Sequence, residues 1–403
     1  MQVLEGTRIL DFTRHMSGPY ATLLLGDFGA DVVKIESMPS GDPARQIGTA
    51  FIGGESGVFL NWNRSKRSVA VDMRRPESKE IIERLVVSAD VLAENFRPGV
   101  AEEMGIGYEA VSALNERLIY LSISAFGPRG PIARFPGTDP VVQAMSGVMS
   151  ITGEVGGGPL LVGLPIADYT AAMVSVQAVL LGLLARHKTG KGQRIDVPMV
   201  SALMFGLTTR LAQYWLTGED PRPEGSAHST VAPYQVYKAK DGNLVAGAWT
   251  AETWPRFCSA LGLDSLATDP RFRTNKDRMT NRAELNGILE PLFASKTLVH
   301  WEERFHHANA LYGPVCSISE ALNHPQTQAL GLVQTLDHPT AGPIPALAVP
   351  ILMSETPGGI KRPPPLFGEH TGEVLKEIGY TPDEIDRMAG TGAVHLHGFQ
   401  TRR

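Results

Sequence analysis

Residues 8–36 read RILDFTRHMSGPYATLLLGDFGADVVKIE, and this stretch carries the pattern that decides the fold. Residues 8–12, with apolar Ile9, Leu10 and Phe12, are a candidate for a short β-strand. Gly18-Pro19 opens a helix that runs to about Phe28, since proline suits the first helical positions. Residues 30–36 predict a second strand. A strand, a helix and a strand in so short a stretch begin an alternating α/β pattern.

The alternation continues through the first half of the chain. Further strands are predicted at 68–72, 91–93 and 118–123, and Pro76 starts a helix whose apolar residues follow helical spacing. Strands separated by helices of this length favour a doubly wound sheet. The predicted fold class is therefore α/β, with a Rossmann-like, mostly parallel sheet.

The chain changes character over residues 227–332, where strand signals are few. Residues 234–246 can form a hairpin across an Asp-Gly turn, and helical segments follow. We therefore expect a smaller α+β domain at 227–332, entered through a Pro-rich linker at 219–226. A large Rossmann-like domain at 1–218 is expected to be completed by the C-terminal segment 333–403.

Charge and composition narrow the range of partners. The chain has 403 residues and a formal net charge of −5, whereas binding to nucleic acid through bulk electrostatics needs a basic excess. Two cysteines cannot build a disulfide framework or a Cys-based metal site, so a reducing cytoplasm is expected. The N-terminus lacks the pattern of a secretory signal. The longest apolar stretch, 171–185, is shorter than the roughly 20 residues of a membrane span, so we expect a buried core helix and no membrane partner.

Asp168 lies where residues 163–170, GLPIADYT, run into the apolar helix 171–186. A helix N-terminus carries partial positive charge and unpaired N–H groups, and both are expected to lower the pKa of this carboxyl group. An ionised carboxylate near an apolar core can act as a nucleophile. A plain helix N-cap is the commoner role of such an aspartate, and the residues alone favour it.

Two other polar segments follow predicted strands, TRHMSGP at 13–19 and ENFRPG at 94–99. Crevices at the carboxyl ends of parallel strands are the usual ligand sites in such sheets. Asn95 offers an amide, Phe96 a stacking face and Arg97 a partner for phosphate. A turn with solvent-facing polar groups fits the same residues equally well.

Five stretches, in this order and spacing, resemble the family III CoA-transferases, which include formyl-CoA:oxalate and carnitine CoA-transferases. They are residues 26–36, 94–99, 137–140, 188–193 and 368–371. The resemblance covers nearly the whole chain. It implies that Asp168 is the family's nucleophilic aspartate, and it outweighs the N-cap interpretation.

The resemblance implies a double-displacement reaction. Asp168 attacks the thioester of a donor acyl-CoA to form a mixed anhydride, and the released CoA thiolate converts the anhydride into an aspartyl-CoA thioester. The acceptor carboxylate then attacks, and CoA departs on the new acyl group. Backbone N–H groups are the expected donors to each oxyanion. Coenzyme A thioesters are the substrates, with no tightly bound cofactor and no metal expected.

The resemblance also implies which residues bind substrate. They are His15, Met16, Ser17, Arg74, Asn95, Phe96, Arg97, Met104 and Asp139, the last matching an active-site glutamate of formyl-CoA transferase. Glu103 and Ser37 depart from the pattern, since other members have basic residues there that bind CoA or its nucleotide. Arg97 or Arg74 can supply the positive charge that is absent at Glu103.

The resemblance thus implies a CoA-transferase, and similarity to one branch of the family favours succinyl-CoA as donor and a small dicarboxylate as acceptor; the expected location is the cytoplasm. The resemblance further implies an interlocked homodimer, with CoA bound by the large domain. The glycine-rich residues 153–158 are either a mobile loop near Asp168 or a surface turn.

Two other functions stay open. An α-methylacyl-CoA racemase of the same family has a His-Asp pair where this chain has Thr138-Asp139, and without the histidine a two-base proton transfer loses one partner. A CoA-binding protein without transferase activity is the other alternative, and the intact Asp168 argues against it.

Overall fold

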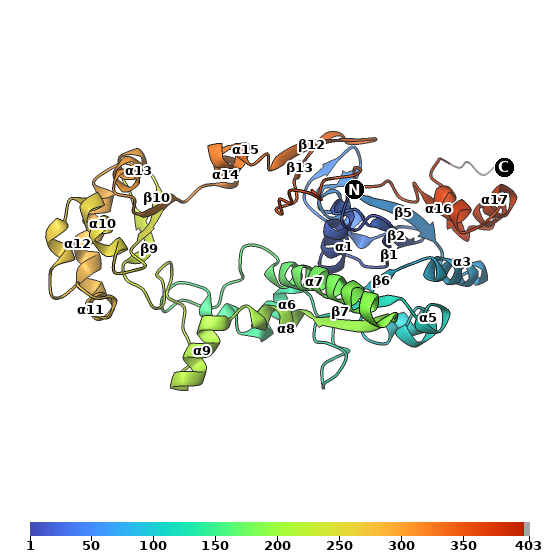
Figure 1. The fold of residues 1–403 in the computed structure, drawn as a ribbon, viewed down its shortest axis with the longest axis horizontal. Coiled ribbons are helices and arrows are strands. Elements are labelled where there is room, and N and C mark those ends of the chain that lie inside the picture. The colour runs from blue at the N-terminus through green and yellow to red at the C-terminus, as the bar shows by residue number, and fades with distance from the viewer. Residues whose placement is uncertain (399–403) are drawn as a thin grey trace. The chain divides into compact units, whose positions relative to one another are not determined.

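The computed structural model describes residues 1–398, and its chain forms two compact units (Figure 1). Unit 1 contains Met1–Val148, Leu161–Gly218 and Gln328–Arg403, and unit 2 contains Met149–Leu160 and Glu219–Thr327. Residues 149–160, expected in the large domain, group with unit 2, where the Gly225 N–H donates to the Gly153 carbonyl at 3.0 Å. Residues 399–403 of the expected large domain lie outside the described residues.

Unit 1 is built on a seven-stranded sheet in the order β14-β5-β2-β1-β6-β7-β8. Its strands are β1 (Arg8–Asp11), β2 (Asp31–Ser37), β5 (Lys66–Val71), β6 (Val91–Glu94), β7 (Ile119–Ser124), β8 (Gln193–Pro198) and β14 (Val394–His395). All pairs are parallel except β14 with β5. The α/β class and the mostly parallel sheet predicted from the sequence are confirmed.

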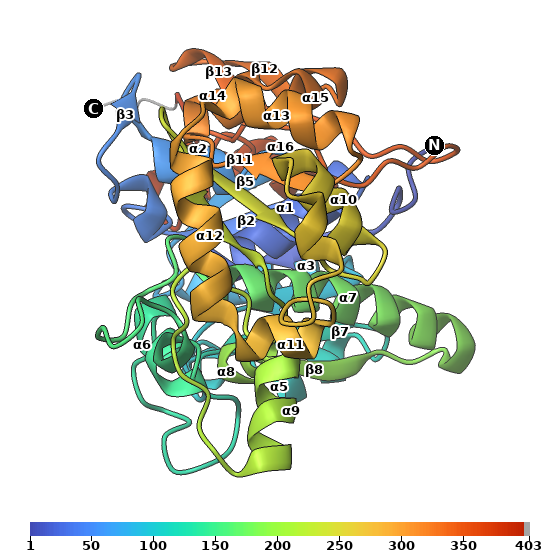
Figure 2. The same ribbon diagram turned by 90° about the vertical axis from the view of Figure 1, so that its left-hand side faces the viewer.

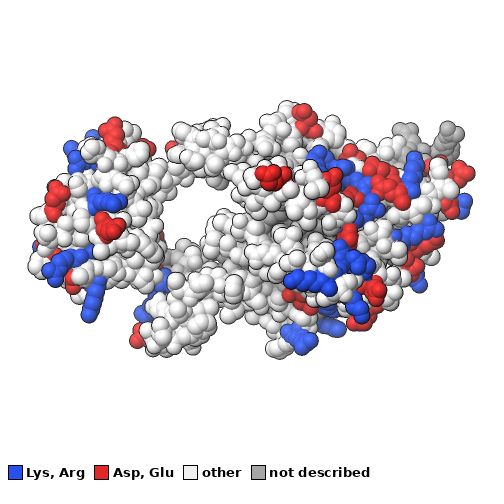
Figure 3. All heavy atoms as spheres, viewed as in Figure 1, with Lys and Arg blue, Asp and Glu red and all other residues white. Residues whose placement is uncertain are grey.

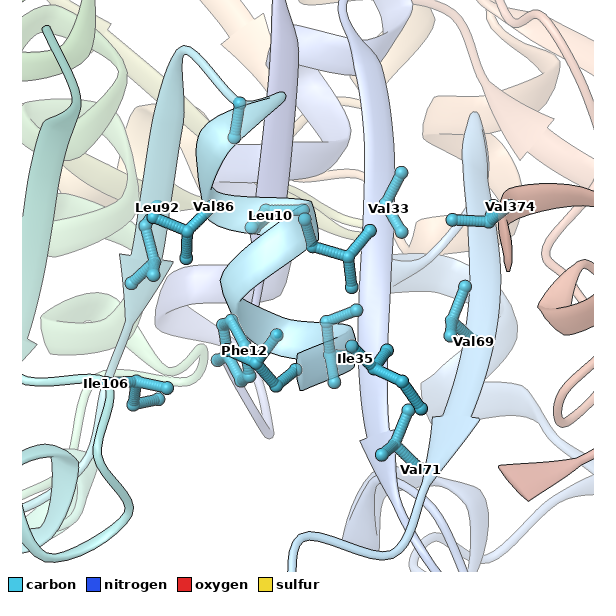
Figure 4. Close-up of a cluster of buried hydrophobic side chains, with 14 of the residues drawn as sticks. Leu10, Phe12, Val33, Ile35, Val69, Val71, Val86, Leu92, Ile106 and Val374 are labelled. Atoms are coloured by element: carbon cyan, nitrogen blue, oxygen red, sulfur yellow. The ribbon is translucent and has the colours of Figure 1, made fainter. Parts of the chain in front are cut away.

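Both faces of this sheet are covered by helices, because successive residues of a strand point to opposite sides. Leu10 belongs to the core on one face and Ile9 to the core on the other. Figure 4 shows the first core, where Leu10 lies beside its register partner Val33. That face is covered by α3 (Pro76–Val87), α5 (Tyr108–Leu114), α16 (Thr371–Glu377) and α17 (Pro382–Gly390). The other is covered by α1 (Ser17–Asp27), α6 (Asp139–Ser146), α7 (Ile166–Thr189) and α8 (Met199–Phe205).

Helix α7 is long and apolar enough to cross a membrane by length and composition, a test that core helices also pass. The expectation that it is buried on most sides is wrong for this chain. Leu180, Leu181 and Leu184 are 43%, 65% and 55% exposed, and only 33% of the most apolar 18-residue stretch of the helix is buried. Small residues form its buried face, because a Cβ on Gly182 would lie 3.0 Å from Ile119 of β7.

Unit 2 contains a three-stranded antiparallel sheet in the order β11-β10-β9. The predicted hairpin at 234–246 is present as β9 (Tyr234–Lys238) and β10 (Asn243–Gly247), and β11 (Leu311–Pro314) joins it. The helices are α10 (Thr253–Leu261), α11 (Asn275–Thr280), α12 (Arg282–Ala294), α13 (Leu298–His307) and α14 (Ile318–Asn323). Aromatic side chains join sheet and helices into one core, in which Tyr237 stacks on Phe293 with ring centroids 4.2 Å apart. Figure 2 shows the ribbons of α10, α11, α12 and α13.

The described chain has further α-helices and strands. They are α2 (Gly57–Trp62), α4 (Val100–Glu103), α9 (Thr208–Thr217), α15 (Pro325–Ala329), and the hairpins β3 (Phe51–Ile52) with β4 (Glu55–Ser56) and β12 (Val333–His338) with β13 (Gly342–Leu347).

Surface charges of unit 1 are interleaved in sign around α3, α16 and α17 (Figure 3). Many of them are paired. Arg67 contacts Asp31 at 2.6 Å, Glu373 at 2.8 Å and Glu377 at 2.6 Å. These ion pairs join α16 of the C-terminal segment to β5 and β2 of the sheet.

Candidate active site

The strand order reverses between β1 and β6. The chain runs from β1 outward through β2 to β5, and then returns to β6 on the other side of β1. Ligands of open α/β sheets bind outside the carboxyl ends of the strands at such a point. The loop after β1 and the loop after β6 meet there. The Asn95 carboxamide accepts the Arg14 N–H at 2.8 Å and donates to the Arg14 carbonyl at 2.7 Å.

A cavity of about 320 Å³ opens between these loops. Its walls include most of the residues predicted for the site: His15, Met16, Ser17, Asn95, Phe96, Arg97, Asp139 and Asp168. Ile47, Trp62 and Phe135 add apolar walls. The structure therefore brings together residues that are far apart in the sequence.

Two predicted residues lie outside this cavity. Met104 lines a second cavity of about 500 Å³ together with Met73 and Arg75. Arg74 has a side chain that is 77% exposed, and it contacts Asp72 at 2.8 Å.

Asp168 lies in the first turn of α7 and lines the first cavity. Burial, together with the nearby charge of Asp139, raises its pKa from the ordinary 3.8 to about 6. The hydroxyl and backbone N–H of Ser17 act in the opposite direction and favour the charged form. The expected lowering of this pKa is wrong, because desolvation and a second carboxylate outweigh the helix N-terminus.

Asp139, at the start of α6, caps the helix that carries Asp168. Its Oδ1 accepts the backbone N–H groups of Ala167 at 2.7 Å and Asp168 at 3.2 Å. Its Oδ2 accepts the Gln143 amide at 2.6 Å, and Gln143 Oε1 accepts the Val162 N–H at 3.0 Å. The capping role considered for Asp168 thus belongs to Asp139, from another helix.

Buried charges hold the loop after β1. The side chains of Lys34 and Asp42 are each 1% exposed, and their charged atoms lie 2.8 Å apart. Lys34 also donates to the Thr13 carbonyl at 2.8 Å, while Asp42 accepts the His15 N–H at 3.2 Å. His15 has a φ of 61°, an unusual value for a residue with a Cβ. The ion pair therefore fixes a strained turn at the wall of the cavity.

Arg14 is a functional candidate that sequence reasoning missed. Its guanidinium carbon lies 5.0 Å from the centre of the Phe96 ring, and Nη2 donates to Ser37 Oγ at 2.8 Å. A cation therefore lies at Ser37, where the resemblance expects a basic residue. The available signal was its place between the predicted strand 8–12 and His15.

Glu94, the last residue of β6, supports the second loop. Its Oε2 accepts the Phe96 N–H at 2.7 Å. The residue is 3% exposed, and burial raises its pKa to about 7.

Within residues 1–398, no group of three or more His, Cys, Asp or Glu side chains is arranged to hold a metal ion.

Known proteins resemble this chain over nearly its whole length. The sequence model of CoA-transferase family III matches residues 4–371. The chain is 38% identical to succinyl-CoA:glutarate CoA-transferase of Mus musculus, over 98% of this chain and 91% of the relative. It is 37% identical to succinate--glutarate CoA-transferase of Agrobacterium fabrum, over 96% of this chain and 97% of the relative. A crystal structure of a CAIB/BAIF family protein from Brucella suis superposes with a TM-score of 0.84 and 32% identity, covering 94% of this chain and 99% of that one.

Proposed function

The chain belongs to CoA-transferase family III, and we propose that it moves CoA from succinyl-CoA to a small dicarboxylate such as glutarate through a covalent intermediate on Asp168. The observation that carries the proposal is the position of Asp168. This partly buried residue lines the same cavity as the predicted substrate-binding residues. The names of the relatives support the choice of donor and acceptor.

The chemistry begins with ionised Asp168. Its carboxylate oxygen attacks the donor thioester carbon, the C–S bond breaks, and CoA leaves as thiolate from the resulting anhydride. The thiolate then attacks the Asp168 carbonyl of the anhydride and releases the donor acid, leaving an aspartyl-CoA thioester. The acceptor carboxylate and the same thiolate repeat the two steps in the opposite sense. A raised pKa suits this role, because a desolvated carboxylate is more nucleophilic than a hydrated one.

We propose that CoA extends from the first cavity past Phe96 toward Met104. Phe96 lines the first cavity, and it packs against the same apolar cluster as Met104. Arg97 at the first cavity, with Arg75 and Lys79 at the second, supplies cations for phosphate groups. These residues supply the positive charge that is absent at position 103, where this chain has Glu103.

Racemase chemistry is less well supported. Thr138 lines the cavity beside Asp139, and a threonine hydroxyl is not a base at neutral pH. One Asp139 oxygen already accepts two N–H groups at the start of α7. A CoA-binding protein without activity would have no need for a nucleophile at this place.

We also propose a homodimer and a cytoplasmic location. Large apolar side chains outside the unit cores support the dimer. Phe205, Trp215 and Leu216 are 83%, 73% and 86% exposed, and the leucines of α7 described above are also partly exposed. Cys258 and Cys316 are free, which suits a reducing compartment. Sedimentation equilibrium tests the dimer, and a monomer at micromolar concentration would contradict it.

The test of the function is a transfer assay read by mass spectrometry. The enzyme is mixed with succinyl-CoA and a pool of mono- and dicarboxylic acids, alongside Asp168→Ala and the exposed control Asp386→Asn. We expect glutaryl-CoA or a related thioester with wild type and the control, and none with Asp168→Ala. New thioesters in the Asp168→Ala reaction would overturn the role of Asp168, and transfer to monocarboxylates alone would overturn the acceptor class.

A further inference from the structure

We infer that Ser17 is a further catalytic residue: its hydroxyl and backbone N–H form the oxyanion site for the carbonyl oxygen of Asp168 itself. Asn95 is the positioning residue that orients this hydroxyl. The inference rests on the proposed aspartyl intermediate, and it assigns a hydrogen-bonding task to a side chain expected only to bind substrate.

The orientation of the Asn95 amide is fixed by the backbone of Arg14. The Arg14 N–H can only donate, so the Asn95 atom 2.8 Å from it is the carbonyl oxygen. The amide nitrogen then faces the Arg14 carbonyl at 2.7 Å and Ser17 Oγ at 3.4 Å. An amide nitrogen donates and does not accept. Ser17 Oγ is therefore the acceptor, and its own proton is free to donate elsewhere.

The inference assigns that proton to Asp168. Ser17 and Asp168 line the same cavity, and Ser17 is only 3% exposed. Both the hydroxyl and the N–H of Ser17 favour the charged form of the Asp168 carboxylate. Ser17 is also the first residue of α1, whose first-turn N–H groups have no partner within the helix.

Two steps of the reaction place negative charge on the Asp168 oxygen. One is the attack of CoA thiolate on the aspartyl carbonyl of the first anhydride, and the other is the attack of the acceptor carboxylate on the aspartyl-CoA thioester. In each, the carbonyl electron pair moves onto the Asp168 oxygen. The electron pair then re-forms the Asp168 carbonyl as the leaving group departs with the electrons of its own bond. In the first step the C–O bond to the donor acid breaks, and in the second the C–S bond to CoA breaks. Ser17 keeps its proton throughout, and donors already in place stabilise such an oxyanion most effectively.

Ser17→Ala tests the inference, with Ser175→Ala as its matched control. Ser175 lies on α7 with Asp168 and is fully buried, and its hydroxyl has no hydrogen-bond partner among residues 1–398. We expect Ser17→Ala to lower kcat by about tenfold with little change in the KM of succinyl-CoA, since the hydrogen bond it removes strengthens in the transition state. We also expect the acidic limb of its pH profile to move to higher pH, and Ser175→Ala to match wild type in both.

A second readout follows the intermediate directly. After rapid mixing with succinyl-CoA and quenching, the aspartyl-CoA thioester should form, and be consumed by glutarate, more slowly in Ser17→Ala than in Ser175→Ala. Equal kcat, pH profile and intermediate lifetime in the two variants would overturn the role of Ser17. Failure of wild type to form any adduct on Asp168 would instead overturn the proposed function.

Asn95 is tested by a double-mutant cycle. Asn95→Asp keeps an oxygen for the Arg14 N–H but offers no proton to Ser17, so its hydroxyl turns away from Asp168. We expect this change to lower kcat in wild type and to have a much smaller effect in Ser17→Ala. Asn95→Ala serves in the same cycle if the aspartate destabilises the loop. Effects that simply add would overturn the positioning role.

Discussion

The buried carboxylate of Asp139 accepts the backbone N–H of Asp168 at 3.2 Å, so the first turn of the helix that carries Asp168 is capped by a second carboxylate. The same contact has two effects. It fixes the first turn of α7, and its negative charge opposes ionisation of Asp168. Asp168 is therefore held in place by a neighbour that also keeps the pKa of its carboxyl group high.

The raised pKa predicts the acidic limb of the pH–rate profile. In the proposed mechanism Asp168 attacks as a carboxylate, and its pKa is about 6. We expect kcat/KM to be level above about pH 7 and to fall about tenfold per pH unit below about pH 6. Initial rates between pH 4.5 and 8.5 with succinyl-CoA measure this, and a profile level down to pH 4.5 would contradict it.

Asp139→Asn should move that limb to lower pH. The substitution removes the charge that opposes ionisation of Asp168, so the pKa of Asp168 falls. Asparagine Oδ1 can still accept the two N–H groups of α7, but its amide meets the donating amide of Gln143. We therefore expect a lower kcat as well. Asp386→Asn, on the exposed side of α17, is the control, and an unshifted limb in Asp139→Asn would refute the electrostatic coupling.

Asp168→Asn should stabilise the fold while abolishing activity. A carboxyl group whose pKa is raised from 3.8 to about 6 costs stability when it is ionised above that range, and the cost disappears as pH falls toward 3.8. We expect a gain of about 1–2 kcal/mol at pH 8, less than the full shift would give because Asp168 is partly exposed. Urea unfolding at pH 8 and pH 4 measures it, and an equal gain at both pH values would point to another cause.

Arg14→Gln should weaken donor binding more than turnover. The cation at Ser37 is expected to contact a phosphate group of CoA, and such charge-assisted hydrogen bonds are worth about 1.5–3 kcal/mol. We therefore expect the KM of succinyl-CoA to rise about tenfold or more. Arg84→Gln is a matched control, because Arg84 also lies over an aromatic ring, that of Tyr380 at 4.1 Å. Equal KM values in the two variants would exclude the contact.

Much of the fold could be predicted because its signals are local. The strands β1, β2, β5, β6 and β7 each contain a short group of apolar residues, and most of their residues are buried. Strand β8 was missed because Arg194 and Asp196 interrupt its apolar residues and one residue of the strand is buried. Strand β14 is two residues long, too short for any periodicity.

The site was predictable in its parts but not in its electrostatics. Asp168 could be singled out from its place before an apolar helix, yet the charge that raises its pKa comes from Asp139, 29 residues away and on another helix. The task of Asn95 was equally hidden, because its partner Arg14 lies 81 residues away in sequence. Such pairings depend on the strand order, which a single sequence does not contain.

The most direct measurement of the central claim is peptide mapping of the enzyme quenched during turnover with succinyl-CoA. We expect one peptide, the one that contains Asp168, to carry the mass of CoA less water, to lose it on addition of glutarate, and to be unmodified in Asp168→Asn. CoA attached to any other residue, or turnover with no adduct at all in wild type, would contradict the account.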